Sequence, residues 1–175
     1  DKQKLVPFGE FLPFEPFLKR FGLKKITEGY GSYSRGNKTE NIILDNLNIL
    51  PLICYEVIFT NMIQKSNNST NLIVNISEDG WFGETIGPSQ HYAKSILRAI
   101  ENNTFLLRSA NKGLSAIIDN KGNTVKILNQ NEAGNIEFEV PLIKSNKNKN
   151  DLIFFILLIT YLCIFFINKK KYAKK

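Results

Sequence analysis

The chain has 175 residues, 43% hydrophobic and 22% charged, which is typical of a globular protein large enough to bury a core. Its formal net charge of +7 is unevenly distributed. Residues 1–143 carry 15 basic and 15 acidic side chains, whereas residues 144–175 carry eight lysines and a single acid, Asp151. The larger part of the chain therefore lacks the basic surface that nucleic-acid binding needs, and we expect no nucleic-acid partner.

The N-terminal region is rich in Pro and Gly, which predicts loops with one short helix. Pro16 suits the first turn of that helix. Four apolar side chains recur at helical spacing around it, namely Phe14, Phe17, Leu18 and Phe21. A stripe of this kind either packs on a core or faces lipid, and we expect packing on the core.

After Asn41 short strands and helices alternate, which predicts an α/β domain. The apolar run at 71–77 is typical of a parallel strand covered on both faces. Residues 120–123, NKGN, predict a hairpin turn. The expected strands are residues 49–55, 71–77, 105–109, 115–119, 124–128 and 135–140, and the expected helices are residues 57–65 and 90–103.

Residues 152–167, LIFFILLITYLCIFFI, contain no charged side chain. A helix of this length spans roughly 24 Å, which is short of a hydrocarbon core of about 30 Å, although flanking lysines can reach the headgroups. A buried core helix is the alternative, but the apolar character on all sides and the lysines at both ends favour a membrane anchor. We therefore expect a polar linker at 144–151, a transmembrane helix at 152–168 and a Lys-rich tail at 169–175. The lysine excess places the tail in the cytoplasm and residues 1–143 across the membrane.

Cys54 is one of two cysteines, and the other, Cys163, lies inside the apolar stretch, so no disulfide is expected. A cysteine where a strand ends is commonly a small buried side chain. The same place also suits a nucleophile on a sharp turn, with the Glu56 carboxylate close by. The only histidine, His91, has no spacing that pairs it with Cys54, and one His with one such Cys does not make a zinc site. We expect no metal.

Three short motifs occur in a characteristic order. Lys2 precedes LVPFGEFLP at 5–13, ICYE follows at 53–56, and ISEDGWFGETIGPSQH occupies 76–91. With these motifs the chain resembles the C-terminal part of the bacterial apolipoprotein N-acyltransferases, which are membrane-embedded members of the nitrilase superfamily. The resemblance extends through LLRSANKGLSAIID at 106–119 and the final apolar helix. It implies the C-terminal part of an αββα sandwich over residues 1–143, followed by one transmembrane helix in the bacterial inner membrane, with the sandwich on the periplasmic side.

The resemblance also implies a Glu-Lys-Cys triad in which Cys54 is the nucleophile and Lys2 is the lysine. Two further essential carboxylates match Glu10, which would position Lys2 or shape the site, and Glu56, which would support the Cys54 turn. The family associates an aromatic pair at the mouth of the site with lipid substrates, and ordinary core packing is the alternative for that pair. The implied substrate-binding residues are Tyr55, Trp81 and Phe82.

The implied reaction is acyl transfer. Cys54 takes an acyl group from the sn-1 ester of a phospholipid as a thioester and passes it to the amino group of diacylglyceryl-cysteine at the N-terminus of an apolipoprotein. Lys2 stabilises the oxyanion of each tetrahedral intermediate. The expected partners are therefore the membrane, a phospholipid donor and a diacylglyceryl apolipoprotein acceptor. No cofactor is implied, because a thiol, an amine and carboxylates suffice.

The chain departs from the family pattern in two places. Residues 78–80 read EDG where the family usually has Asn-Asp before the aromatic pair, which leaves the geometry of that loop in question. The triad glutamate lies upstream of the matching Lys2 in the family, and none of Glu10, Glu15 and Glu28 matches it. Three functions stay open: the N-acyltransferase, which we favour, a carbon-nitrogen hydrolase acting on amides or nitriles, and an inactive remnant held in the membrane.

Overall fold

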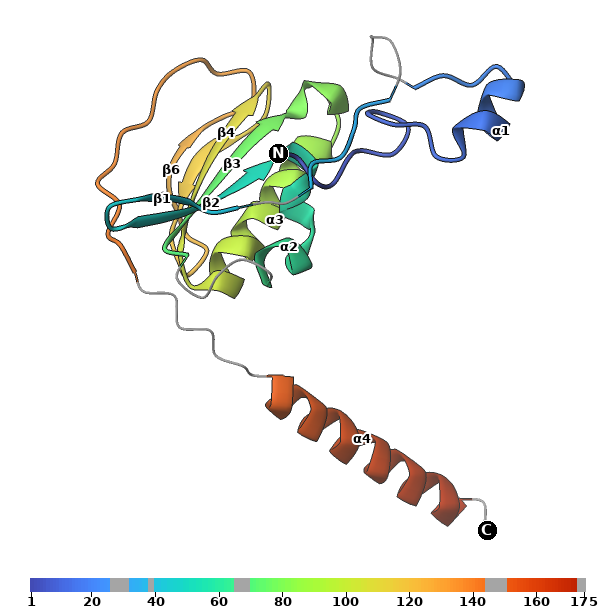
Figure 1. The fold of residues 1–175 in the computed structure, drawn as a ribbon. Helices are drawn as coiled ribbons and strands as arrows, with labels where there is room; N and C mark the ends of the chain where they lie inside the picture. Colours follow the sequence, from blue (N-terminus) through green and yellow to red (C-terminus); the bar gives the residue numbers. More distant parts are fainter. Residues whose placement is uncertain (26–31, 38–39, 65–69, 144–150, 173–175) are drawn as a thin grey trace.

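The computed structural model describes residues 1–25, 32–37, 40–64, 70–143 and 151–172 (Figure 1). Its centre is a mixed six-stranded sheet in the order β1-β2-β3-β4-β5-β6. The inner strands β2, β3 and β4 run parallel, and β1, β5 and β6 pair antiparallel with their neighbours. The strands are β1 (Ile42–Leu44), β2 (Leu47–Ile53), β3 (Leu72–Glu78), β4 (Phe105–Asn111), β5 (Ser115–Ile118) and β6 (Thr124–Leu128).

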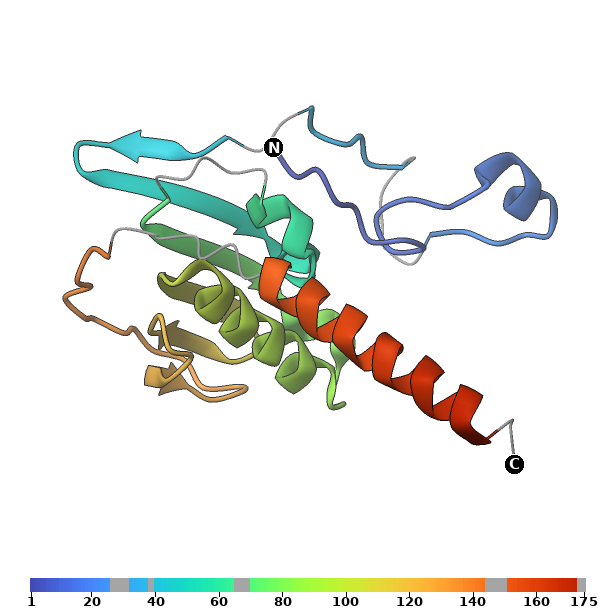
Figure 2. The same ribbon diagram turned by 90° about the horizontal axis from the view of Figure 1, so that it is seen from below.

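Helices cover one face of this sheet, and α3 lies along it in both ribbon views (Figures 1 and 2). Short 3-10 turns, η1 and η2, follow β2 and β3 directly. The helical elements are α1 (Glu15–Arg20), η1 (Cys54–Ile58), α2 (Thr60–Gln64), η2 (Asp79–Phe82), α3 (Gly87–Asn102) and α4 (Asp151–Tyr172). The predicted α/β domain and hairpin are confirmed, whereas the helix predicted over 57–65 is split into η1 and the shorter α2.

The main core lies between the sheet and α3. Leu52, Ile73 and Leu106 project from the three parallel strands and are at most 1% exposed. Val57 and Ala99 pack on them from the helical side. Full burial of a branched aliphatic side chain stabilises the fold by about 1.5–3 kcal/mol. The core therefore fixes the parallel strands, and with them the strand ends that carry the sequence motifs.

The opposite face of the sheet is covered only in part. The strand predicted over 135–140 is wrong, because this segment crosses the face without pairing as a strand. Ile136 and Val140 pack against the cluster of Leu72, Phe105 and Ile117. Alternating apolar residues indicate only that one side of a segment is buried. A segment that lies across a sheet has the same pattern as a strand within the sheet, so the pattern does not distinguish them.

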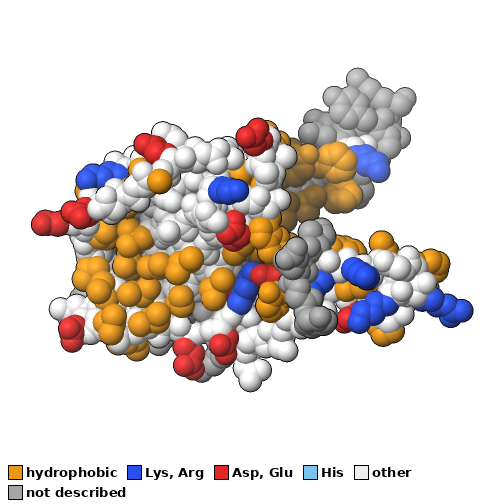
Figure 3. Space-filling model, turned by 90° about the horizontal axis from the view of Figure 1, so that it is seen from above, with side chains coloured by type: hydrophobic (Ala, Val, Ile, Leu, Met, Phe, Trp, Pro, Cys, Tyr) orange, Lys and Arg blue, Asp and Glu red, His pale blue; other side chains and the backbone are white. Residues whose placement is uncertain are grey.

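Hydrophobic side chains gather in a broad patch over the sheet end of the molecule (Figure 3). On the face opposite α3, Ile42, Leu44, Ile53 and Ile76 remain 38–62% exposed. The described residues therefore form one sheet and one helical layer, which is half of the αββα sandwich that the resemblance implies.

The apolar stripe predicted around Pro16 differs from expectation, and the exposed side of α3 is apolar as well. Phe14, Phe17 and Phe21 on α1 are 63–83% exposed, so the prediction that this stripe packs on the core is wrong. The short α1 lies away from the sheet, and none of its residues is buried (Figure 1). On α3, Leu97 and Ile100 are exposed as well. The buried residues of α3 are instead mainly polar, namely Pro88, His91, Ser95, Arg98, Ala99 and Asn102.

The C-terminal apolar run forms α4, whose side chains from Leu152 to Ile167 are exposed. Figure 1 shows this helix apart from the sheet. Within the part of the chain that the structure describes, no helix is long and apolar enough to cross a membrane, so the predicted transmembrane helix at 152–168 is not confirmed. Of the linker predicted at 144–151, residues 144–150 lie outside the described residues and Asp151 begins α4; of the tail predicted at 169–175, residues 169–172 end α4 and residues 173–175 lie outside the described residues.

Candidate active site

The sequence motifs meet at the carboxyl ends of the parallel strands. Cys54 follows β2, and the turn Asp79–Phe82 follows β3. Because β2 and β3 are parallel neighbours, the residues after them emerge at the same edge of the sheet. Open α/β sheets bind ligands in the crevice beyond this edge.

Cys54 occupies a strained turn. Its φ angle of 52° lies in the left-handed region, which non-glycine residues seldom adopt. The thiol is unpaired and the residue is half-buried. The predicted sharp turn at the end of a strand is therefore confirmed. Backbone strain of this kind costs about 1–3 kcal/mol and persists only where the surroundings enforce it.

Glu56 helps to hold the Cys54 turn in this conformation. Its side chain is buried, and its Oε2 accepts a hydrogen bond from the Ile53 amide at 2.9 Å. Its Oε1 accepts from the amides of Gln3 at 2.6 Å and Lys4 at 3.2 Å. One carboxylate therefore joins the residue before Cys54 to the backbone that follows Lys2. This geometry fits the supporting role that the resemblance implies for Glu56.

Lys2 and Glu10 form a close ion pair. The Lys2 Nζ donates to Glu10 Oε1 at 2.6 Å, and the two side chains are only 14% and 16% exposed. The other oxygen of Glu10 accepts from the Val6 amide at 2.9 Å, which closes the loop between them. Both residues line a cavity of about 310 Å³ together with Tyr33 and Arg35. This contact fits the positioning role that the resemblance implies for Glu10.

The three predicted aromatic residues have different surroundings. Tyr55 packs edge-on against Phe59, with 5.1 Å between ring centroids. Trp81 is 48% exposed and lies against Gly9, where an added Cβ would come within 2.6 Å of its ring. Phe82 is 38% exposed and packs edge-on against the His91 ring. Core packing does not account for Trp81 and Phe82, because a large part of each remains at the surface.

Glu78, where the chain departs from the family pattern, forms hydrogen bonds that hold the loop after β3. Glu78 Oε1 accepts from the Gly80 amide at 2.9 Å, and Oε2 accepts from Asn111 Nδ2 at 2.7 Å. The carboxylate therefore closes the turn after β3 and ties it to the end of β4.

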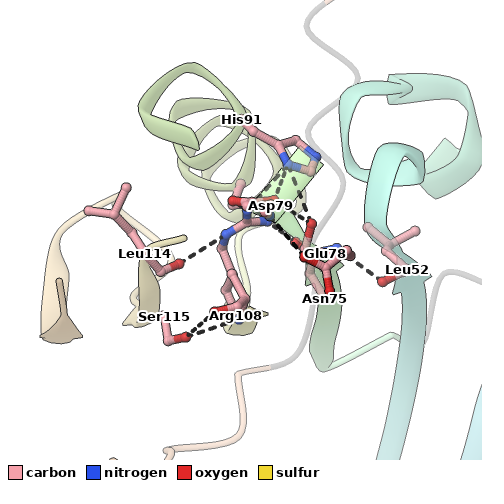
Figure 4. Close-up of polar contacts among 12 residues, drawn as sticks. Leu52, Asn75, Glu78, Asp79, His91, Arg108, Leu114 and Ser115 are labelled. Carbon is pink, nitrogen blue, oxygen red and sulfur yellow. Dashed lines mark hydrogen bonds and ion pairs between the residues drawn. The ribbon is translucent and has the colours of Figure 1, made fainter. Parts of the chain in front are cut away.

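A buried polar cluster beneath this loop escaped the sequence analysis (Figure 4). Asp79 is fully buried, and its Oδ2 accepts from Arg108 Nη2 at 2.6 Å. Its Oδ1 accepts from Ser77 Oγ at 2.6 Å and from His91 Nδ1 at 2.9 Å. Burial alone raises the pKa of the Asp79 carboxyl, but the His91 hydrogen bond and the Arg108 charge outweigh it and hold this pKa below its ordinary value.

Arg108 connects this cluster to β2, the strand that precedes Cys54. Its Nη1 donates to the side-chain oxygen of Asn75, and its Nε donates to the Leu114 carbonyl at 3.1 Å. Asn75 Nδ2 in turn donates to the Leu52 carbonyl at 3.0 Å. The available signal was the polar Asn75 and Arg108 inside otherwise apolar strands, because a buried polar side chain needs a partner. Among the described residues, no group of His, Cys, Asp and Glu could hold a metal ion.

The sequence profile of the family described as "Carbon-nitrogen hydrolase" matches residues 2–146. The chain belongs to the carbon-nitrogen hydrolase family. Among its relatives is a protein of Brucella melitensis biotype 1 that is 39% identical over 81% of this chain, and one of Rickettsia typhi that is 44% identical over 80%. Both are named apolipoprotein N-acyltransferase. This carbon-nitrogen hydrolase chain spans only 27% and 28% of their lengths, about a quarter.

Solved structures show the same fold. A CN-hydrolase superfamily protein from Xanthomonas campestris is 18% identical, with a TM-score of 0.53 that covers 76% of this chain and 48% of that protein. The NitN amidase from Neterenkonia sp. AN1 is 16% identical, with a TM-score of 0.50 covering 75% and 47%. The described sheet and helices thus correspond to about half of a carbon-nitrogen hydrolase fold.

Proposed function

We propose that this chain carries the nucleophile, the lysine and the aromatic residues of an apolipoprotein N-acyltransferase. The observation that carries the proposal is the Glu56 carboxylate, which binds the Ile53 amide beside Cys54 and the Gln3 amide beside Lys2. The names and the 39–44% identity of the relatives support the reaction class.

In the first step, the Cys54 thiolate attacks the sn-1 ester carbonyl of a membrane phospholipid. A carbon–sulfur bond forms and the ester carbon–oxygen bond breaks, so the acyl group is held as a thioester. The lysophospholipid leaves with the proton that the thiol gave up. The Lys2 ammonium, held by Glu10, stabilises the negative oxygen of the tetrahedral intermediate.

In the second step, the amino group of diacylglyceryl-cysteine in an apolipoprotein attacks the thioester carbonyl. A carbon–nitrogen bond forms, the carbon–sulfur bond breaks, and the amine proton returns to the Cys54 sulfur. In this proposal a glutamate that is not among the motif residues of this chain acts as the general base. No cofactor enters either step.

Two exposed apolar surfaces support a lipid substrate. The phenylalanines of α1 are mostly exposed and are accompanied by Lys19 and Arg20, a combination that suits an interface with lipid headgroups. The α4 side chains from Leu152 to Ile167 are uncharged on all sides of the helix and exposed. We place both helices at the bacterial inner membrane, with residues 1–143 on the periplasmic side and Trp81 and Phe82 facing the acyl chain.

Hydrolysis of a small amide is the second candidate function. The family membership and the likeness to an amidase favour it. The exposed apolar surfaces of α1 and α4 favour the lipid substrate instead, because a hydrolase of small soluble amides needs neither.

The test uses the protein expressed from its complete gene and reconstituted into phospholipid vesicles, with a diacylglyceryl-cysteine peptide as the acceptor. We expect Cys54→Ser to lower acyl transfer at least about a thousandfold, because a covalent nucleophile is removed. Cys163→Ser is the matched control and should retain transfer, since this thiol lies on α4. Acyl transfer by Cys54→Ser would contradict the proposal, and release of ammonia from small amides without acyl transfer would favour the second candidate.

A further inference from the structure

The support beneath Phe82 comes from a side chain that the proposed mechanism does not use. We infer that His91 is a positioning residue that fixes Phe82 at the edge of the sheet and thereby sets the preference for long acyl chains. The inference rests on the proposed function, because it takes Phe82 as part of the acyl-binding surface.

Phe82 is held from one side and open on the other. Its ring meets the His91 ring edge-on, with 5.7 Å between centroids and an interplanar angle of 62°. A Cβ added at Gly87 would come within 2.6 Å of Phe82 Cδ1, so the first turn of α3 also contacts the ring closely. With 38% of Phe82 exposed, the free side of the ring is available to a ligand.

His91 is itself fixed through one ring nitrogen, Nδ1, which lies 2.9 Å from Asp79 Oδ1, 3.4 Å from Ser77 Oγ and 3.3 Å from Arg108 Nη2. A carboxylate only accepts, so Nδ1 carries the hydrogen that bonds to Asp79 Oδ1 at 2.9 Å. The other ring nitrogen, Nε2, is buried and has no hydrogen-bond partner among the described residues. The orientation of the ring therefore depends on Asp79, which Arg108 and Ser77 hold in turn.

The same carboxylate also begins the turn that carries Phe82. Asp79 is the first residue of η2 and Phe82 is the last. Asp79 therefore belongs to the turn that carries Phe82 and also holds the His91 ring that supports Phe82. Figure 4 shows Asp79 between His91 and Arg108. A change at His91 leaves the turn in place but removes the support on the inner side of Phe82.

The test compares two phospholipid donors, one with a palmitoyl and one with a hexanoyl chain at sn-1, by the rate at which Cys54 becomes acylated in the protein expressed from its complete gene. His91→Asn keeps a donor for Asp79 and removes the ring. We expect it to lower the palmitoyl-to-hexanoyl rate ratio roughly tenfold, because small displacements at a binding surface change rates by one to two powers of ten. We also expect Phe82→Ala to lower the ratio, and the double variant to be no worse than Phe82→Ala alone.

The matched control is Asn102→Ala at the other end of α3. Asn102 is buried and donates to the Arg98 carbonyl, so this change lowers the melting temperature without touching Phe82 and should keep the ratio. A second variant, Gly87→Ala, displaces Phe82 and leaves Asp79 untouched, and it should lower the ratio even if His91→Asn does not fold.

An unchanged ratio in folded His91→Asn or in Gly87→Ala overturns the inference about His91. Absence of acylated Cys54 in the unaltered protein with both donors overturns the proposed function itself, so the two failures are distinguishable.

Discussion

The buried carboxylate of Glu56 binds the amide of Gln3, which lies 53 positions earlier in the chain, as well as that of Ile53. A carboxylate can accept all of these hydrogen bonds, whereas an amide of the same shape turns an NH2 group toward backbone donors. The strained turn at Cys54 and the backbone beside Lys2 therefore both depend on the charge of this side chain.

We expect Glu56→Gln to lower the free energy of unfolding by about 3 kcal/mol, since hydrogen bonds to a buried charged group are lost. Urea unfolding measures this change. Glu101→Gln is a suitable control, because Glu101 is 38% exposed and its ion pair with Arg98 contributes less than about 1 kcal/mol. Equal effects of the two substitutions would show that the Glu56 contacts do not stabilise the fold.

Asp79 makes stability depend on pH. Its pKa in the folded chain lies below the ordinary value of 3.8, so the folded state binds the proton less readily than the unfolded state does. The stability that ionised Asp79 contributes is fully present above its pKa in the unfolded state. It is lost as the pH falls through its pKa in the folded state.

Asp79→Asn should therefore be less stable than the unaltered protein at neutral pH and should lose less stability on acidification below about pH 4. Urea unfolding across this range measures both effects. Parallel acid losses in the two proteins would contradict the assignment.

At this scale, sequence motifs identified the residues to which we assign direct chemical roles, but not the buried polar residues beneath them. Cys54, Lys2 and Glu10 stand in recognisable motifs, and the contact of Lys2 with Glu10 matches the implied one. Asn75 and Arg108 could be seen only as polar residues in apolar strands. Their partnership spans 33 positions in the sequence, and no local pattern specifies a contact at that distance.

At the level of elements, the sequence pattern predicted strands correctly where their side chains pack into the core. The strands at 105–109, 115–119 and 124–128 are found within two residues of their expected bounds. The prediction of a strand at 135–140 was wrong, because an alternation of apolar and polar residues does not distinguish a strand paired within a sheet from a segment packed across its face. The prediction that the apolar stripe on α1 packs on the core was wrong, because helical spacing identifies an apolar face but not what covers it.

The exposed face of α1 leads to a prediction for Phe17→Ser with Phe21→Ser. These side chains are 63% and 66% exposed, so the melting temperature should stay nearly unchanged. If the face contacts lipid, the KM for vesicle phospholipid should rise roughly tenfold while the rate with a soluble short-chain donor stays the same, because apolar area buried in the lipid is lost. Leu97→Ser, on the exposed side of α3, is the control for lost surface apolarity. An unchanged KM in the α1 variant would exclude α1 from the lipid interface.

Across the whole molecule, both the net charge and the exposed apolar surface are unevenly distributed. The net charge of +7 comes from residues 144–175, while residues 1–143 are balanced. The sheet buries one face beneath α3 and leaves Ile42, Leu44 and Ile76 exposed on the other. The chain accordingly matches about half of a solved carbon-nitrogen hydrolase structure. Composition showed the charge imbalance, but only the folded sheet shows which apolar side chains stay uncovered.

We propose that the edge formed after β2 and β3 transfers an acyl group through Cys54. The most direct measurement is mass spectrometry of the protein expressed from its complete gene after incubation with phospholipid vesicles and no acceptor. We expect one acyl adduct, on the peptide that contains Cys54, which hydroxylamine removes and an added diacylglyceryl-cysteine peptide discharges. An adduct on Cys163 alone, or none while the acceptor peptide is still acylated, would contradict it.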